Sequence, residues 1–302
     1  MRYRTLGRTG LEVSVIGIGT WQFGGEWGKA IGEGEARAIL DRARERGINL
    51  LDTAECYGPD HLSERLVGSA IAGRRDEWVV ATKFGHEFVA HNQRDSAWSP
   101  AQVIAQLEAS LRALRTDHVD LYQFHSGSDA EFFREDLWDA LQAQVRLGKI
   151  RHLGVSISSQ GFNLGQVEAA DRFGIGAIQV VYNRLDRGPE EKILPACVRM
   201  DLGVMARVPL ASGYLSGKYR PGHPFPADDV RASHNPLKAK ARLEQALAIQ
   251  RDEVPPGTDM AQWALAWCLG RPEVTCVIPG CKDPGQVDRN AAAADLLPPA
   301  SP

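Results

Sequence analysis

The chain has 302 residues, of which 43% are hydrophobic, and its formal net charge is −3. This length and composition suit one domain with a substantial core over residues 1–302, and the small net charge argues against a nucleic-acid partner. No apolar run approaches a membrane span, and residues 1–4 lead into polar sequence rather than a signal peptide, so we expect a cytoplasmic protein away from membranes.

The first element that we predict is a hairpin over residues 2–11, with two short strands around the turn Gly7-Arg8-Thr9-Gly10. After it, short apolar strands alternate with helical segments. Strands are predicted at 13–19, 48–52, 78–82, 119–124, 150–155, 177–181, 203–208 and 274–278. Helices are predicted at 35–47, 61–71, 100–114, 132–147, 164–173, 190–200, 260–269 and 284–293.

Eight strands separated by helices predict an α/β fold, a (β/α)8 TIM barrel with an N-terminal β-hairpin plug and extra helices outside the barrel. Residues 221–236 are polar, rich in proline and without periodicity, so we interpret them as a mobile loop over the pocket. Residues 237–249 predict one of the extra helices.

A glycine pattern near the first core strand, Gly17-Ile18-Gly19, suggests a dinucleotide-binding fingerprint. That fingerprint needs a third glycine where Gln22 stands, and a helix where a loop is predicted. We therefore reject a Rossmann domain.

Titratable side chains stand at or just after the ends of three successive predicted strands. Asp52 ends one strand and Tyr57 follows on its exit loop, while Lys83 and His125 end the next two. The carboxyl ends of barrel strands meet at one face, where active sites lie. A nearby cation can lower the pKa of a tyrosine from about 10, and a carboxylate can hold that cation. Each residue alone could be a solvated charge or a satisfied histidine, but together they predict a site.

These residues carry a resemblance to a known family. Asp52-Thr53-Ala54-x-x-Tyr57-Gly58, Thr82-Lys83 and Gln123-x-His125 resemble the catalytic tetrad of the aldo-keto reductases, in their bacterial-type branch with a short C-terminal tail. The resemblance implies reduction of an aldehyde or ketone to an alcohol by hydride transfer. Tyr57 is then the general acid, Lys83 lowers its pKa, Asp52 holds Lys83, and His125 orients the carbonyl oxygen. The pocket walls are then expected to come from Trp21, from Trp98 or nearby loop residues, and from residues 221–236. The substrate is a small carbonyl compound, with an apolar or aromatic aldehyde as our guess.

The resemblance also implies NADP(H) as the cofactor. Barrels often bind phosphate beside the loops after strands seven and eight. Lys282 stands where the family usually has an arginine for the 2′-phosphate, and it lacks the planar fork, so NAD(H) is expected as a weaker alternative. Two further departures affect the nicotinamide end, namely Ile157 for an asparagine and Arg207 for a stacking aromatic. The predicted cofactor residues are Thr20, Trp21, Asp52, Ser156, Gln179, Arg207, Pro209, Leu210, Ser212, Gly213, Lys218, Gly280, Lys282, Gln286 and Asn290.

The cysteines give no sign of a disulfide framework or a zinc site, because none stands in a CxxC or zinc spacing. They are Cys56, Cys197, Cys268, Cys276 and Cys281. We interpret them as reduced thiols, mostly in the core. Cys281 is expected to be partly exposed, and Cys56 to border the pocket without a chemical role.

Two other functions remain open. A cofactor-sensing regulatory subunit, like the channel-associated branch of the same family, would keep the fold and turn over slowly, although the intact tetrad argues against it. A metal-dependent barrel hydrolase is disfavoured because none of the eight histidines forms an H-x-H or HExxH pair, so no metal site is predicted. The physiological substrate, the direction of reaction and the choice between monomer and homo-oligomer are not determined by the sequence.

Overall fold

The computed structural model describes residues 1–158 and 163–298, and its centre is an eight-stranded parallel sheet. The strand order is β12-β11-β10-β9-β8-β5-β4-β3. Bridges from Ile16 to Val277 and from Gly19 to Gly280 join the two edges, so the predicted (β/α)8 barrel is confirmed. The strands are β3 (Ile18–Gly19), β4 (Leu50–Asp52), β5 (Val79–Phe84), β8 (Val119–His125), β9 (Ile150–Ser156), β10 (Ile175–Val181), β11 (Gly203–Arg207) and β12 (Cys276–Val277).

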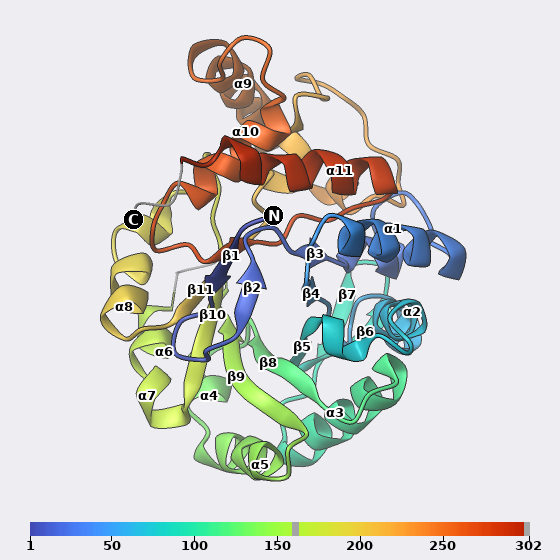
Figure 1. Ribbon diagram of the computed structural model, residues 1–302, viewed down its shortest axis with the longest axis vertical. Helices are drawn as coiled ribbons and strands as arrows, with labels where there is room; N and C mark the ends of the chain where they lie inside the picture. The colour runs from blue at the N-terminus through green and yellow to red at the C-terminus, as the bar shows by residue number, and fades with distance from the viewer. Residues whose placement is uncertain (159–162, 299–302) are drawn as a thin grey trace.

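Helices surround this barrel (Figure 1). They are α1 (Glu33–Glu45), α2 (Leu62–Ala70), α3 (Pro100–Leu114), α4 (Asp129–Phe132), α5 (Glu135–Arg146), α6 (Leu164–Glu168), α7 (Ala170–Phe173), α8 (Ile193–Arg199), α10 (Met260–Leu269) and α11 (Pro284–Ala292). Short 3-10 turns add η1 (Trp21–Gly24), η2 (Pro59–His61), η3 (Arg75–Glu77), η4 (Gly188–Glu190), η5 (Ala211–Ser216), η6 (Val230–Ser233) and η7 (Ala293–Leu296). The extra helix predicted at 237–249 is α9 (Pro236–Asp252), which projects beyond the ring in Figure 1.

Local sequence explains where helices begin. Ser99 caps α3, because its hydroxyl accepts a hydrogen bond from the backbone N–H of Gln102 at 3.3 Å, and Pro100 occupies the first helical position. Two predicted helices differ from the structure. The segment expected at 132–147 is α5, with only its first residue, Phe132, belonging to the preceding α4. The segment expected at 164–173 is divided into α6 and α7, which meet at Ala169.

The amino-terminal hairpin closes one end of the barrel, as predicted, but its second strand lies beyond the predicted range 2–11. Val13 and Ser14 pair with the first hairpin strand, so the core strand predicted at 13–19 is reduced to β3. β1 (Tyr3–Thr5) pairs antiparallel with β2 (Glu12–Ser14), and both cross the middle of the view in Figure 1. Leu6 and Val13 are fully buried and pack with barrel residues that include Leu121 and Met205. Leu6 lies against Gly203 at the start of β11, where a side chain would meet it. The plug therefore adds apolar contacts inside the barrel at the end opposite the strand carboxyl termini.

The close approach of Leu6 to Gly203 gives a stability prediction. A Cβ at position 203 would lie 2.6 Å from Leu6 Cγ and 2.7 Å from its backbone carbon. We expect Gly203→Ala to lower the free energy of unfolding by ~1–3 kcal/mol through overpacking, measured by urea unfolding. The control is Gly34→Ala in α1, where a Cβ meets nothing within 4 Å, and we expect it to be neutral or slightly stabilising. Equal stability of the two variants would contradict this account of the plug.

A second hairpin, β6 (His86–Ala90) with β7 (Gln93–Ser96), follows β5 and is absent from our sequence prediction. Its residues are mostly polar and half-exposed, so they show little of the apolar alternation that predicts strands. Asn92 turns the chain with a positive φ of 56°. The hairpin matters because it brings His86, Asn92 and Arg94 to the wall of a cavity that also contains Asp52 at the end of β4.

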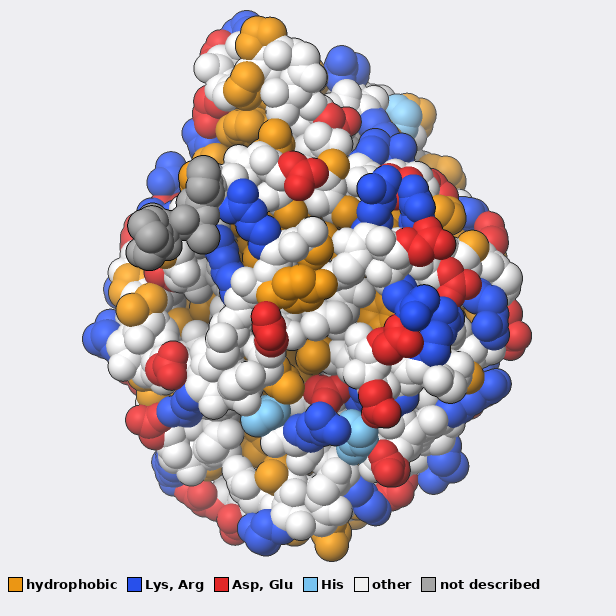
Figure 2. Space-filling view, in the orientation of Figure 1, with side chains coloured by type: hydrophobic (Ala, Val, Ile, Leu, Met, Phe, Trp, Pro, Cys, Tyr) orange, Lys and Arg blue, Asp and Glu red, His pale blue; other side chains and the backbone are white. Residues whose placement is uncertain are grey.

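The surface and the cysteines complete the description. Basic and acidic side chains are interspersed over the face shown in Figure 2. Among the described residues, no helix combines the length and apolarity needed to span a membrane. All five cysteines are free and buried. The expected exposure of Cys281 is wrong, because its thiol is 0% exposed and accepts a hydrogen bond from Asn290 Nδ2 at 3.3 Å.

Candidate active site

The carboxyl ends of β4, β5 and β8 bring the tetrad residues together. Asp52 is the last residue of β4, Lys83 lies near the end of β5, and His125 ends β8. Tyr57 follows β4 on its exit loop, which turns at Gly58 with a φ of 85°. These strands are parallel neighbours in the sheet, so their ends meet at the same face of the barrel.

Lys83 connects Asp52 to Tyr57. Its Nζ donates hydrogen bonds to Asp52 Oδ2 at 2.8 Å, to the Thr53 carbonyl at 2.7 Å and to Tyr57 Oη at 3.1 Å. Lys83 is 0% exposed, and these three acceptors use all three of its N–H bonds. The phenol oxygen of Tyr57 thus accepts from the ammonium, and its own O–H can donate to another group.

The second oxygen of Asp52 is held by two amides. Oδ1 accepts hydrogen bonds from Gln179 Nε2 at 2.7 Å and from Gln123 Nε2 at 3.1 Å. Ser156 Oγ in turn donates to Gln179 Oε1 at 3.4 Å. Gln123 was not among the predicted site residues, although it lies in the Gln-x-His motif that identified His125. Both carboxylate oxygens are satisfied, which offsets the cost of burying the charge.

Burial changes the protonation of these groups. It raises the pKa of Tyr57 to about 12, and the charge of Lys83 opposes that rise without reversing it. We expected Lys83 to lower this pKa below its usual value, but desolvation of the phenolate outweighs the lysine. Burial also acts to lower the pKa of Lys83, yet Asp52 and Tyr57 raise it above its usual range. At neutral pH the phenol therefore keeps its proton and the ammonium keeps its charge.

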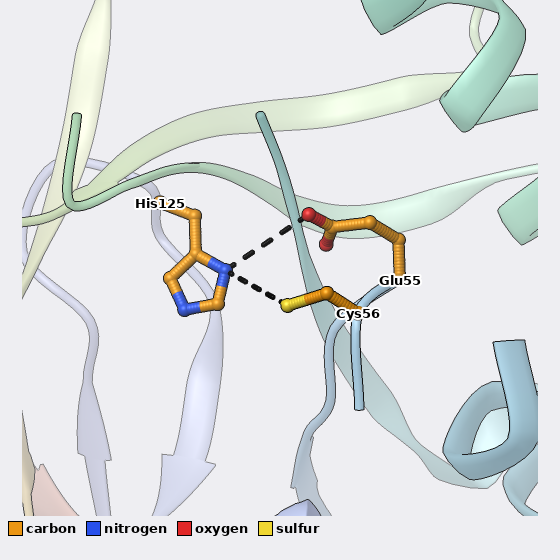
Figure 3. A group of neighbouring side chains, drawn as sticks. All are labelled: Glu55, Cys56 and His125. Atoms are coloured by element: carbon orange, nitrogen blue, oxygen red, sulfur yellow. Dashed lines mark hydrogen bonds and ion pairs between the residues drawn. The ribbon is translucent and has the colours of Figure 1, made fainter. Parts of the chain in front are cut away.

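His125 lies beside Tyr57, with the two rings edge to face and their centroids 6.0 Å apart. Burial lowers the pKa of His125 well below its usual range, and the neighbouring cations Lys83 and Arg207 lower it further. The imidazole is therefore neutral near pH 7. Its Nδ1 faces Cys56 Sγ at 3.8 Å and Glu55 Oε1 at 4.0 Å (Figure 3).

Glu55, Cys56 and His125 form the one group of potential metal donors found among the described residues. Their donor atoms lie within 4.8 Å of one another. The separations of His125 Nδ1 from Cys56 Sγ and Glu55 Oε1, 3.8 and 4.0 Å, exceed the roughly 3.4–3.6 Å between donors around a tetrahedral zinc. The sequence predicts no metal, and we draw no metal site from this more open set.

A cavity of about 460 Å³ opens above the tetrad and contains Tyr57, His125 and Cys56 in its wall. Of the predicted cofactor residues, only Ser156 does not line it, and Ser156 reaches it through Gln179. The predicted residues in its wall are Thr20, Trp21, Asp52, Gln179, Arg207, Pro209, Leu210, Ser212, Gly213, Lys218, Gly280, Lys282, Gln286 and Asn290. Segments far apart in the chain are thus gathered around one volume.

Basic side chains gather where the loops after β11 and β12 meet. Lys282, Lys218 and Arg231 line this part of the cavity. Burial lowers the pKa of Lys282, and Arg231, Lys29 and Lys218 lower it further through their charges. Its Nζ donates to the carbonyl oxygen of Trp27. These positive charges repel one another, and a bound anion would relieve that repulsion. This part of the cavity is therefore suited to bind phosphate.

Arg207 and Ile157 are the two departures from the family pattern at the end of the cavity expected to hold the nicotinamide. Arg207 ends β11, lines the cavity and donates from Nη2 to the Ile157 carbonyl oxygen at 3.1 Å. Its Nε is buried without a hydrogen-bond partner in the described part of the chain. The side chain of Ile157 is buried in the apolar core and does not line the cavity. The family's asparagine therefore has no counterpart at this position, whereas Arg207 supplies a donor next to the cavity.

The cavity roof depends on residues that sequence reasoning missed. Glu26 is 2% exposed, and its Oε2 accepts from Trp21 Nε1 at 2.8 Å and from Arg94. Its Oε1 accepts from the backbone N–H of Asn92 at 2.7 Å, and its carbonyl oxygen accepts from Val230 at 2.8 Å. Three segments thus meet at Glu26, two of them at its carboxylate and the third at its backbone carbonyl. No sequence pattern marks these contacts, because all three lie on irregular segments or a polar hairpin.

Two expected wall elements behave differently. Trp98 does not line the cavity but packs behind it on Gly85, where a Cβ would lie 2.0 Å from the indole ring. Of residues 221–236, expected as a mobile loop, only Arg231 lines the cavity. The segment contacts the loop after β3, because Trp27 bridges to Asp229 and the Val230 N–H donates to the Glu26 carbonyl oxygen at 2.8 Å.

The sequence model of the aldo/keto reductase family matches residues 15–300. The chain belongs to the aldo-keto reductase family. One relative, aldo-keto reductase YhdN of Bacillus subtilis, is 32% identical over 95% of this chain and 87% of its own length. A probable voltage-gated potassium channel subunit beta of Arabidopsis thaliana is 31% identical, over 99% of this chain and 92% of its own.

A solved structure gives the same result. The holo form of aldo-keto reductase AKR11C1 from Bacillus halodurans superposes with a TM-score of 0.78 and 31% identity, covering 100% of this chain and 92% of that one. The predicted family and fold are therefore confirmed. Members of the family are oxidoreductases that use nicotinamide cofactors, and a small carbonyl compound fits as the substrate of this aldo-keto reductase.

Proposed function

We propose that the protein reduces an aldehyde or ketone to an alcohol with NADPH, and that Tyr57 is the general acid. The observation that carries this proposal is the continuous chain Asp52–Lys83–Tyr57 at the cavity wall. In this chain the protonated phenol of Tyr57 accepts a hydrogen bond from the ammonium of Lys83. Asp52 is the counter-ion of that ammonium. His125 stands next to this phenol.

Each residue has a distinct part in the proposed reaction. When bound, a reduced nicotinamide would be the source of the hydride for the carbonyl carbon. Tyr57 donates its proton to the carbonyl oxygen, and Lys83 stabilises the phenolate that this transfer leaves. Asp52 keeps Lys83 in place and balances its charge. His125, as a neutral imidazole, orients the carbonyl oxygen through a hydrogen bond.

The residues around the cavity fit a nicotinamide dinucleotide. Gln179 and Ser156 offer polar atoms near Asp52, and Arg207 offers a buried N–H without a partner among the described residues. At the opposite end, Lys218 and Lys282 would hold phosphate groups. Lys282 is a point charge rather than a fork, so we propose a preference for NADPH that is less strict than an arginine would give.

This assignment predicts a selective effect of Lys282. Lys282→Met is expected to weaken NADPH binding roughly tenfold or more, because a hydrogen-bonded charge is lost, and to change NADH binding much less. The measurement is titration of each cofactor, followed by quenching of tryptophan fluorescence, since Trp21 and Trp27 line the cavity. Lys240→Met on α9, at a residue outside the cavity wall, is the control. Equal weakening of both cofactors would contradict a 2′-phosphate contact.

The test of the whole proposal is NADPH titration into the pure protein, followed by a panel of carbonyl compounds. The wall near Tyr57 combines Trp21 and Trp27 with the polar His86, Asn92 and Arg94, so the panel should contain aromatic aldehydes and polar ones. Quenching on binding, then oxidation of NADPH when a carbonyl is added, would support the proposal. Failure of NADPH to bind would remove it.

A second function has support in the plant relative named as a potassium channel subunit beta. In this alternative the protein binds the cofactor and acts as a regulatory sensor with slow turnover. Single-turnover and multiple-turnover rates distinguish the two. A fast hydride transfer followed by very slow cofactor exchange with every substrate would favour the sensor, whereas sustained turnover would favour the reductase.

A further inference from the structure

The two ring nitrogens of His125 have different surroundings (Figure 3). Nδ1 faces Cys56 Sγ at 3.8 Å and Glu55 Oε1 at 4.0 Å, while Nε2 points away from both side chains. The ring lines the cavity. A neutral imidazole carries one proton, so only one of its nitrogens can donate a hydrogen bond. Which nitrogen holds the proton decides whether His125 can donate to a carbonyl oxygen from Nε2.

The imidazole is held neutral by its neighbours on every side. Burial lowers the pKa of His125, and positive charges lower it further from β5 (Lys83), from the β6–β7 hairpin (His86 and Arg94) and from β11 (Arg207). Burial raises the pKa of the Cys56 thiol above its usual range, so the sulfur keeps its proton. A protonated thiol thus faces a neutral ring.

The two side chains near Nδ1 would favour opposite tautomers. A carboxylate accepts, so Glu55 would draw the ring proton to Nδ1, whereas a thiol that donates to Nδ1 leaves the proton on Nε2. The geometry favours Cys56. Its sulfur lies within hydrogen-bonding distance of Nδ1, while Glu55 Oε1 lies farther than a hydrogen bond and already accepts from the His86 backbone N–H at 3.1 Å.

The other neighbour of the sulfur supports the same arrangement. Arg94 lies close enough to Cys56 to affect its ionisation, and a guanidinium can only donate. The thiol proton therefore has no acceptor in Arg94 and has one in His125 Nδ1. In addition, burial raises the pKa of Glu55 well above its usual range and so favours its neutral carboxyl form, which does not draw a ring proton to Nδ1 as a carboxylate would.

We propose that the Cys56 thiol donates a hydrogen bond to His125 Nδ1 and thereby holds the ring in the tautomer whose Nε2–H can donate to a substrate carbonyl. Cys56 is then a positioning residue that acts through His125. Its effect on catalysis rests on the reductase function proposed above, whereas the tautomer itself does not.

Nitrogen NMR of protein labelled with 15N-histidine tests the tautomer directly, without cofactor or turnover. His125 signals are assigned from their loss in His125→Asn. In the wild type we expect the pattern of an unprotonated Nδ1 and a protonated Nε2. Cys56→Ser keeps a proton donor and should keep that pattern. Cys56→Ala, and Cys56→Val as a donor-free variant that keeps the volume, should shift population toward the Nδ1–H form.

Several results would overturn the proposal. A wild-type ring protonated on Nδ1 would do so alone, even if a Cys56 variant failed to fold. The proposal would also fail if the wild type, Cys56→Ala and Cys56→Val gave the same spectrum. It would fail equally if Cys56→Ser gave the spectrum of Cys56→Ala. In kinetics, we expect kcat/KM for reduction to fall roughly five- to tenfold in Cys56→Ala and less in Cys56→Ser, with cofactor Kd unchanged. If neither the wild type nor any Cys56 variant reduces a carbonyl compound, but their spectra differ as expected, the reductase proposal fails and the tautomer assignment stands.

Discussion

Replacing Tyr57 by phenylalanine is expected to lower kcat for carbonyl reduction by about 10²-fold or more and to leave cofactor binding nearly unchanged. The ring would keep its stacking on Trp21, at 5.9 Å, and its edge contact with His125. Only the hydroxyl, with its bond to Lys83, is lost. Steady-state kinetics and fluorescence titration measure the two effects separately, and near-normal turnover in this variant would eliminate Tyr57 as the acid.

The matched control for this change is Tyr3→Phe, which removes a hydroxyl bonded to the Gly47 carbonyl on the hairpin plug. We expect its kcat to equal that of the wild type. The pH profile gives a second check. Because burial raises the pKa of Tyr57 to about 12, the phenol stays protonated through neutral and mildly alkaline pH. Reduction should therefore show no fall attributable to Tyr57 in that range, and alcohol oxidation, which needs the phenolate, should rise with pH.

Removing the charge of Lys83 should reduce both activity and stability. Lys83→Met leaves Asp52, which is 2% exposed, as a buried carboxylate with only the two glutamine amides as partners. Breaking a buried pair in this way typically costs ~3–5 kcal/mol, and we expect a loss of that order in urea unfolding. Since the phenolate also loses its cation, kcat should fall by about 10²-fold or more.

A double variant separates the two effects of Lys83. Lys83→Met combined with Asp52→Asn removes both charges, so it should recover much of the lost stability but none of the activity. Lys149→Met, at a partly exposed pair with Glu108, is the control and should cost at most ~1 kcal/mol. If the double variant is no more stable than Lys83→Met, the loss comes from packing and not from the uncompensated carboxylate.

The elements that follow regular periods were predictable, because their signals are local. Apolar strands, the Ser99-Pro100 helix start and the Gly7–Gly10 turn each depend on neighbours in sequence. The carboxyl-end rule for parallel strands then placed Asp52, Lys83 and His125 on one face. The β6–β7 hairpin escaped prediction, since polar, half-exposed strands lack the alternation that marks a buried face.

The sequence by itself was enough to predict the barrel, the four residues that we propose as the tetrad, and loops that line the cavity. Only the tertiary structure decided how these groups act on one another. Burial of Tyr57 outweighs the effect of Lys83 on its pKa, Glu26 joins three irregular connections, and Cys56 lies against His125. Desolvation depends on everything packed around a group, and these contacts join residues up to 204 positions apart, from Glu26 to Val230. Neither the desolvation of a group nor its long-range contacts can be predicted from a local sequence pattern, because both depend on the folded chain.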